Sequence, residues 1–318
     1  MFRSLFILLS KASWAQKLIM SLGFARYMAT RFVAGDYIDD AVEAIKSLNA
    51  RGILATLDHL GENTTNAGEA ENSAKAIKGM LDAIVNSGIK SNVSIKLSQI
   101  GYNLGGDICI NILRDILTYA KKNNIFIRID MEDSSTVDNT LAYYTTMRKE
   151  GLDNVGLVMQ SYLYRSEKDI RKLMDLYTPI RLCKGAYKEP ASVAFPSKAD
   201  VDKNYDLIAS ILLDTSLDET APKQSENGYF PPLPALATHD EKRIDFVKQY
   251  SAKKHIPSSN FEFQMLYGIR RDLQETLVKE GFGVRIYVPF GTQWYPYFMR
   301  RLAERPANLW FMLSNLLR

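Results

Sequence analysis

Eight short runs of apolar and β-branched residues recur from residue 50 onward, separated by longer segments whose apolar residues lie three and four positions apart. Two of these longer segments are DICINILRDILTYAKKNN (107–124) and DEKRIDFVKQYSAKK (240–254), and their basic carboxyl-terminal ends suit a helix dipole. Alternation of strands with helices predicts parallel βαβ units. The predicted strands cover residues 53–58, 93–97, 125–130, 155–160, 180–184, 235–240, 261–266 and 284–288.

Eight such units over about 240 residues match a closed (βα)8 TIM-type barrel in number and size. An open doubly wound sheet is the alternative, but no G-x-G-x-x-G motif opens a helix and no P-loop occurs; GYNLGGD (101–107) fits neither spacing. Among the long connections, we expect 185–201 to form an active-site loop and 214–233 a surface excursion. The sequence therefore predicts an N-terminal helical arm (1–50) and a catalytic barrel (51–318).

Composition is ordinary for a globular protein of 318 residues, and a net charge of +4 is too small to indicate nucleic-acid binding. The chain has two cysteines, Cys109 and Cys183, and three histidines without H-E-x-x-H spacing. Neither a disulfide framework nor a metal centre is expected, and a reducing compartment such as the cytoplasm fits.

The first 35 residues carry five basic side chains and no acidic one. Their apolar run LFILL is too short to span a bilayer. Three interpretations stay open: a helical arm packed on the barrel, a mitochondrial transit peptide, or an amphipathic arm in peripheral contact with an anionic membrane surface.

Almost every predicted strand ends on a side chain that can hydrogen bond or carry charge. Any one of them alone would more often cap a turn or helix, but in a barrel these ends converge on one mouth. Together they favour a binding site, and they are Asp58, Lys96, Asp130, Gln160, Lys184, His239, Gln264 and Tyr287.

Positive charge is the second feature of this mouth, since Lys96, Lys184, Arg181, Arg300 and Arg301 have few carboxylates to neutralise them. We therefore expect an anionic ligand, and paired arginines can hold a carboxylate bidentately. A surface ion pair of Arg300 with Glu304 at i,i+4 is the alternative for the arginine pair. No G-x-S-x-G elbow or Ser–His–Asp order supports acyl-transfer hydrolysis.

Five ordered motifs resemble the signature of the proline dehydrogenase family: RLCKGAY (181–187), ATHD (237–240), FEFQMLYG (261–268), RIYVPFG (285–291) and Y-x-x-R-R-L-x-E (297–304). VSIKLSQIG (93–101) and RIDMED (128–133) fit the second and third strands of the same family. The likeness runs from about Ile53 to near the carboxyl terminus. It is to the monofunctional bacterial form, because the chain lacks room for an aldehyde dehydrogenase half.

This resemblance implies a distorted barrel that binds FAD, with its last helix over the mouth. It implies oxidation of L-proline to Δ1-pyrroline-5-carboxylate by hydride transfer from C5 to flavin N5, with the electrons passing to a quinone. By motif, Lys96, Arg300 and Arg301 hold the substrate carboxylate. Tyr187 and Tyr287 pack around the substrate ring.

Further roles follow from the same motifs. Asp130 positions Tyr287 or Lys96, Leu182 and Leu266 form apolar walls, and Glu62 pairs with Arg300 as a gate. Asp240 stands where asparagine is expected in many relatives, so the resemblance does not assign it a contact with FAD. The implied FAD contacts are Asp130, Gln160, Arg181, Cys183, Lys184, Gly185, Ala186, Tyr187, Thr238, His239, Gln264 and Glu304.

Two functions without a flavin stay open beside this one. A barrel aldolase or lyase would use Lys96 or Lys184 to form a Schiff base with its substrate. A membrane-associated scaffold would use the basic N-terminal arm, and the polar strand ends would then serve only as caps.

Overall fold

The structure is a computed structural model that describes residues 29–304, with side chains only as far as Arg301 in the last helix. The basic segment before residue 29 and the side chain of Glu304 lie outside the described residues. The predictions made for them therefore remain predictions.

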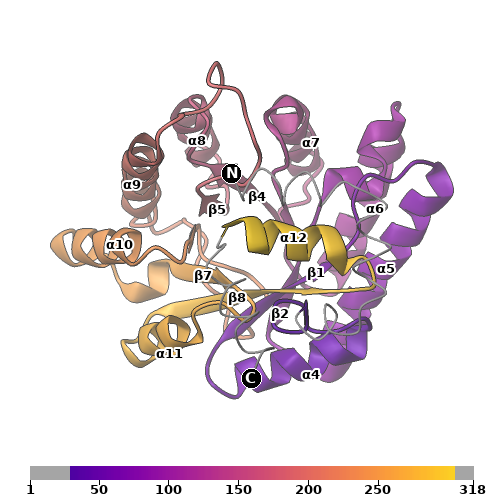
Figure 1. Cartoon of the computed structure of the whole chain (residues 1–318), viewed down its shortest axis with the longest axis horizontal. Coiled ribbons are helices and arrows are strands. Elements are labelled where there is room, and N and C mark those ends of the chain that lie inside the picture. The colour runs from indigo at the N-terminus through magenta and orange to yellow at the C-terminus, as the bar shows by residue number, and fades with distance from the viewer. Residues whose placement is uncertain (1–28, 305–318) are drawn as a thin grey trace, which may run out of the picture.

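Eight parallel strands close into a barrel in the order of the chain, and β8 pairs with β1 to complete it (Figure 1). The closed order confirms the predicted (βα)8 architecture and excludes the open doubly wound sheet. The strands are β1 (Leu54–His59), β2 (Ser91–Ile95), β3 (Ile127–Ile129), β4 (Val155–Gln160), β5 (Ile180–Cys183), β6 (Pro234–Ala237), β7 (Glu262–Leu266) and β8 (Gly283–Phe290).

Helices surround this barrel because each has one apolar face. In α6 (Ile108–Lys122), for example, the buried residues Leu113, Ile116, Leu117 and Ala120 follow helical spacing. The other α-helices are α4 (Ile38–Asn49), α5 (Ala67–Ser87), α7 (Val137–Lys149), α8 (Ser166–Met174), α9 (Lys198–Thr215), α10 (Glu241–Lys253), α11 (Arg271–Lys279) and α12 (Trp294–Glu304). Short 3-10 helices are η1 (Leu97–Ile100), η2 (Tyr102–Leu104), η3 (Ser134–Thr136) and η4 (Ser258–Asn260).

The main hydrophobic core lies between the outward faces of the strands and these helices. Helix α4 belongs to it through Ala41, Ile45 and Leu48, although it falls within the predicted N-terminal arm. No helix in the described part of the chain is long and apolar enough to cross a membrane.

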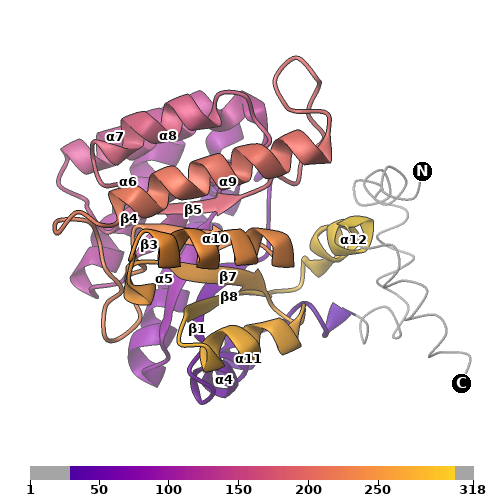
Figure 2. The ribbon, with the colours of Figure 1, turned by 90° about the vertical axis from the view of Figure 1, so that its left-hand side faces the viewer.

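Helix α12 departs from the outer ring and crosses the mouth of the barrel, as the family resemblance implied (Figure 1). Figure 2 shows it beyond one end of the barrel. A second apolar cluster holds it there, in which Phe32 and Val33 pack with Trp294, Tyr297 and Phe298. Backbone hydrogen bonds of 2.9 Å from Ala34 to Pro289 and from Gly291 to Gly35 fasten the same segment to the end of β8.

The connection from α9 to β6 is more than the predicted surface excursion. Part of it is exposed, but Gly228 and Leu233 are buried, and Phe230 packs against Phe126 with ring centroids 5.9 Å apart. This connection precedes β6, so it lies at the amino-terminal end of the barrel, opposite the mouth. The prediction missed this because polar and Pro-rich composition does not show which backbone atoms are buried.

The interior of the barrel contains charged groups where such barrels usually hold branched apolar side chains. Arg285 Nε donates to both carboxylate oxygens of Glu262, at 2.9 and 3.1 Å, and both side chains are 0% exposed. Arg285 Nη1 also donates to the carbonyl oxygens of Ala55 and Gly228, each at 2.9 Å. These bonds offset much of the cost of burying the ion pair.

We expect Arg285→Met to lower the free energy of unfolding by about 3–5 kcal/mol, because Glu262 would become an uncompensated buried charge. Arg51 provides a matched control, since it pairs with Glu275 at 3.2 Å while the two side chains are 40% and 46% exposed. Arg51→Met should cost about 0–1 kcal/mol. Equilibrium urea denaturation measures both, and equal losses would contradict this account of the buried pair.

Candidate active site

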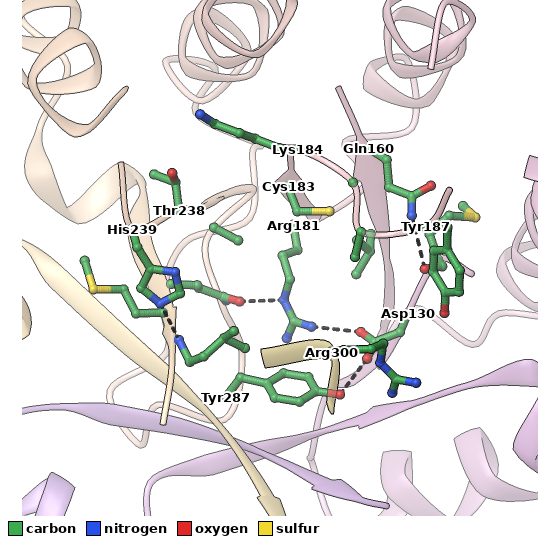
Figure 3. A pocket seen from close by; sticks show the side chains of 18 of the residues that line it. Asp130, Gln160, Arg181, Cys183, Lys184, Tyr187, Thr238, His239, Tyr287 and Arg300 are labelled. Carbon is green, nitrogen blue, oxygen red and sulfur yellow. Dashed lines mark hydrogen bonds and ion pairs between the residues drawn. The ribbon is translucent and has the colours of Figure 1, made fainter. Parts of the chain in front are cut away.

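A cavity of about 600 Å³ opens at the carboxyl-terminal ends of the strands, beneath α12 (Figure 3). The side chains predicted from the strand ends and motifs come together there, among them Lys96 after β2, Gln264 on β7 and Tyr287 on β8. Of the predicted site residues with described side chains, Leu182 and the fully buried Asp58 do not line the cavity. The cavity walls also include Glu132, Lys198 and Tyr297, which the sequence analysis did not assign.

Leu182 is fully buried in the main core, so the prediction that it walls the substrate site is corrected. Its neighbours Arg181 and Cys183 line the cavity. Successive side chains of a strand point to opposite faces, and the two neighbours leave Leu182 facing the surrounding helices.

Lys96 lies deep in the site and is held by Asp58, whose two oxygens accept from its Nζ at 2.9 and 3.1 Å. Asp58 lies on the adjacent strand β1 and was among the strand-end groups predicted to form the site, but the family motifs gave it no separate role. Burial alone would lower the pKa of Lys96, but Asp58 and Asp130 raise it. Lys96 therefore remains an ammonium at neutral pH, which does not suit the neutral amine that a Schiff-base mechanism needs.

Tyr287 donates from its hydroxyl to Asp130 Oδ2 at 2.9 Å, and the same oxygen of Tyr287 lies 3.4 Å from Lys96 Nζ. Of the two roles expected for Asp130, the structure shows the contact with Tyr287. Burial and the nearby carboxylates of Asp130 and Asp58 raise the pKa of the Tyr287 phenol well above its ordinary value. The phenol therefore stays protonated and keeps its role as donor.

Arg181 joins this pair from β5 and is 6% exposed. Its Nη1 donates to Asp130 Oδ1 at 2.8 Å and its Nε donates to Gln264 Oε1 at 2.5 Å. Its guanidinium carbon also lies 5.4 Å from the centre of the Tyr287 ring. Figure 3 shows Arg181 reaching toward Asp130 and Tyr287 in the middle of the cavity.

At the mouth, Arg300 forms a bidentate pair with Glu62, with distances of 2.6 Å from Nη2 and 3.3 Å from Nη1. This confirms Glu62 as a partner of Arg300, while the alternative pairing with Glu304 lies outside the described side chains and stays a prediction. Burial would lower the pKa of Arg300, but Glu62 raises it. Arg301 lies beside it on α12, with its guanidinium carbon 5.0 Å from the Tyr297 ring centre.

Carboxylates are far more numerous around the cavity than predicted. Lys184 Nζ lies 2.5 Å from Asp202 and 2.6 Å from Asp240, so it too is paired. Lys96 and Arg181 likewise pair with Asp58 and Asp130. Arg300 pairs with Glu62. The prediction of few carboxylates was wrong because a buried charge requires a partner, and such partners come from positions far apart in sequence.

Asp240 serves two purposes. Its Oδ1 accepts from the Lys242 amide at 3.1 Å and caps α10, while Oδ2 pairs with Lys184. Burial would raise the pKa of the Asp240 carboxyl, but the bonds to Lys184 and Lys198 lower it to about 2. Asp240 is therefore an anion at any pH near neutrality.

The loop after β5 is held close to the barrel. Gly185 has φ +116, and a Cβ there would meet the Tyr162 ring at 2.3 Å, so a larger residue would clash. Glu189 accepts from the Ser134 amide at 2.7 Å and from its hydroxyl at 2.6 Å. Gly185, Ala186 and Tyr187 therefore form a fixed part of the cavity wall, as expected of an active-site loop.

For two polar side chains of the cavity wall, Gln160 and His239, the hydrogen bonds show which atoms donate and which accept. Gln160 Nε2 donates to the carbonyl oxygens of Glu132 at 3.1 Å and Met131 at 3.4 Å. Its Oε1 is buried and accepts no hydrogen bond from the described residues. His239 Nε2 accepts from the Leu266 amide at 3.0 Å, which requires that nitrogen to be unprotonated.

Comparison with known proteins points to one family. The profile of the family described as proline dehydrogenase matches residues 41–313. The chain is 43% identical to proline dehydrogenase 1 of Bacillus subtilis (strain 168) over 318 residues, which covers 100% of both chains. It is 43% identical to the proline dehydrogenase of Deinococcus radiodurans over 295 residues, which covers 92% of this chain and 90% of that one.

Among solved structures, the fold is similar to proline utilization A (PutA) from Bdellovibrio bacteriovorus inactivated by N-propargylglycine, with a TM-score of 0.79. That likeness covers 95% of this chain and 36% of the other at 24% sequence identity, and shows the fold alone. The family profile and the full-length relatives carry the assignment. The chain belongs to the proline dehydrogenase family.

Proposed function

We propose that this proline dehydrogenase oxidises L-proline to Δ1-pyrroline-5-carboxylate with FAD as its resident cofactor. The observation that carries the proposal is the convergence of three cations, Lys96, Arg300 and Arg301, in the same cavity as the polar groups expected for a flavin. When bound, FAD takes the hydride from C5 of proline at its N5 position and releases the electrons to a quinone.

The residues of the cavity suit such a cofactor. A volume of about 600 Å³ lies within the range of cofactor sites. Gln160 Oε1 is a buried acceptor that still needs a donor, and the isoalloxazine ring has an N–H group of that kind. Arg181 and Lys184 supply positive charge for reduced flavin or phosphate, while Thr238 and His239 add polar contacts from the end of β6.

The substrate carboxylate is the anion that the mouth of the cavity accepts. Arg300 and Arg301 are adjacent on α12, so their side chains diverge by about 100° and can approach one carboxylate from two directions. Lys96 adds a third positive group from the barrel end of the site. Charge-assisted bonds of this kind fix the orientation of the pyrrolidine ring as well as its affinity.

The other groups shape the ring site. Tyr187, Tyr287 and Leu266 line the cavity and would pack against the pyrrolidine, with the Tyr287 hydroxyl oriented by Asp130. Hydride leaves C5 only when the ring nitrogen is a neutral amine, because its lone pair forms the new C=N bond, so the ammonium proton has to be lost first. Glu62, which binds Arg300 at 2.6 Å, serves as a gate that closes α12 over the substrate.

Electron transfer to a quinone requires contact with the membrane at least from time to time. We propose that the basic segment at the start of the chain, with five cations in its first 35 residues, makes this peripheral contact from the cytoplasmic side. A mitochondrial matrix protein would meet its membrane in the same way.

The proposal is tested by the colour of the purified protein. After incubation with FAD and removal of free cofactor, the protein should be yellow, and L-proline should bleach the flavin band under anaerobic conditions. Pyrrolidine, which has the same ring but no carboxylate, should bleach it far more slowly. A protein that retains no FAD, or a flavin that proline leaves oxidised, would contradict the proposal.

The clamp is tested by Arg301→Met. Loss of one charge-assisted contact, about 1.5–3 kcal/mol, should raise the KM for proline roughly ten- to a hundredfold while FAD stays bound. Steady-state kinetics and the flavin absorbance of the same sample measure both. Arg171→Met is the matched control, because Arg171 pairs with Glu167 on the surface of α8 and should leave KM unchanged. An unchanged KM in Arg301→Met would refute the clamp.

A further inference from the structure

A chain of hydrogen bonds runs through the interior of the barrel from Arg285 to the cavity. Glu262 accepts from Arg285 at 2.9 Å and from Gln264 Nε2 at 2.5 Å. The other end of the same amide, Gln264 Oε1, accepts from Arg181 Nε at 2.5 Å. Arg181 then donates to Asp130, which accepts from Tyr287. The chain thus joins a wholly buried ion pair to the groups around the substrate site.

Glu262 is the member of this chain whose chemistry decides the orientation of the next one. An ionised carboxylate only accepts hydrogen bonds, whereas the amide of Gln264 has a donating and an accepting end. Glu262 therefore takes the NH2 end of Gln264, and the carbonyl end is left for Arg181. The reverse orientation would place an oxygen against a carboxylate and an NH2 against a guanidinium.

The position of Glu262 is set independently of the cavity. Its side chain is 0% exposed and is not part of the cavity wall. Arg285 binds both of its oxygens and is itself tied to the carbonyls of Ala55 and Gly228, near the amino-terminal end of the barrel. A rigid anchor of this kind can hold the amide of Gln264 in one orientation.

We infer that Glu262 is a positioning residue for the reaction: by fixing which end of Gln264 faces Arg181, it holds Arg181 on Asp130 and so orients Tyr287. This inference rests on the proposed function, because Tyr287 and Arg181 are there assigned to proline and flavin. Arg181 has two anchors within the described residues, Gln264 and Asp130. Loss of the bond to Gln264 lets the guanidinium turn away from Asp130.

Glu262→Gln tests this in the flavin-loaded enzyme. Glutamine nearly keeps the size of the side chain but can present either end of its amide to Gln264, so the orientation is no longer imposed. We expect the KM for proline to rise about tenfold, the magnitude of one charge-assisted bond. The visible absorption band of the bound flavin should shift as well, since Arg181 lines the cavity.

A double-mutant cycle with Gln264→Met shows whether the effect passes through Gln264. Methionine has a similar length and does not impose this hydrogen-bond pattern. If Glu262 acts through Gln264, adding Glu262→Gln to Gln264→Met should change KM by less than about twofold, within the additivity error of such cycles. If the two effects multiply, the relay is refuted.

Tyr144→Phe is the control for a loss of stability alone. The Tyr144 hydroxyl donates to Thr178 at 2.8 Å, both side chains are 0% exposed, and neither lines the cavity. This variant should lower Tm without changing KM or the flavin band. If Glu262→Gln behaves in the same way, Glu262 is only structural and the inference fails.

Glu262→Asp keeps the experiment decisive if Glu262→Gln does not fold. Aspartate retains the charge for Arg285 but ends one methylene short of Gln264, so KM should still rise at least threefold. An unchanged KM in a folded Glu262→Asp enzyme would overturn the inference. Failure of the wild-type protein to retain FAD would instead refute the cofactor proposal, so the two failures are distinguishable.

Discussion

Ion pairs lie inside this barrel and at the base of its cavity, and the arrangement of the cavity depends on them. Removing an ion from water costs several kcal/mol, and pairing with an opposite charge together with further hydrogen bonds offsets that cost. Glu262, Asp130 and Asp58 provide such partners for Arg285, Arg181 and Lys96. Because the two members of each pair come from different strands or strand ends, these ion pairs form only when the barrel closes.

In the proposed function, the same ion pairs would make the site selective for an anionic substrate. Cations and carboxylates are nearly balanced in the resting arrangement, so a substrate carboxylate has to compete with Glu62 for Arg300. Competition of this kind lowers the affinity for the carboxylate but restricts how it can bind, because the anion must match the positions of several donors together. The carboxylates of Asp58 and Asp130 also keep Lys96 charged and Tyr287 protonated.

Closure of the mouth depends on packing more than on charge. Phe32 and Val33 pack with residues of α12, and backbone bonds join this segment to the end of β8. The helix that carries Arg300 is thus fixed by residues near the start of the chain. The rings of Trp294, Tyr297 and Phe298 are buried in this cluster.

Much of this could be predicted from the sequence, because hydrophobic periodicity is a local signal. All eight strands were found near their predicted positions, and seven of the eight polar groups predicted at their ends line one cavity. Leu182 was misplaced because a motif shows that a residue is near a site, but only the pleat shows which way it points. The partners of Lys96 and Lys184 could not be predicted, since Asp58 and Asp202 are joined to them only by the fold.

A crystal structure of the flavin-loaded enzyme with an unreactive cyclic carboxylate in the site tests the central claim most directly. We predict that the ligand carboxylate lies within hydrogen-bond distance of Lys96, Arg300 and Arg301, while Arg181 still bridges Gln264 and Asp130. A carboxylate bound away from these three cations, or an Arg181 released from both partners, would contradict the account.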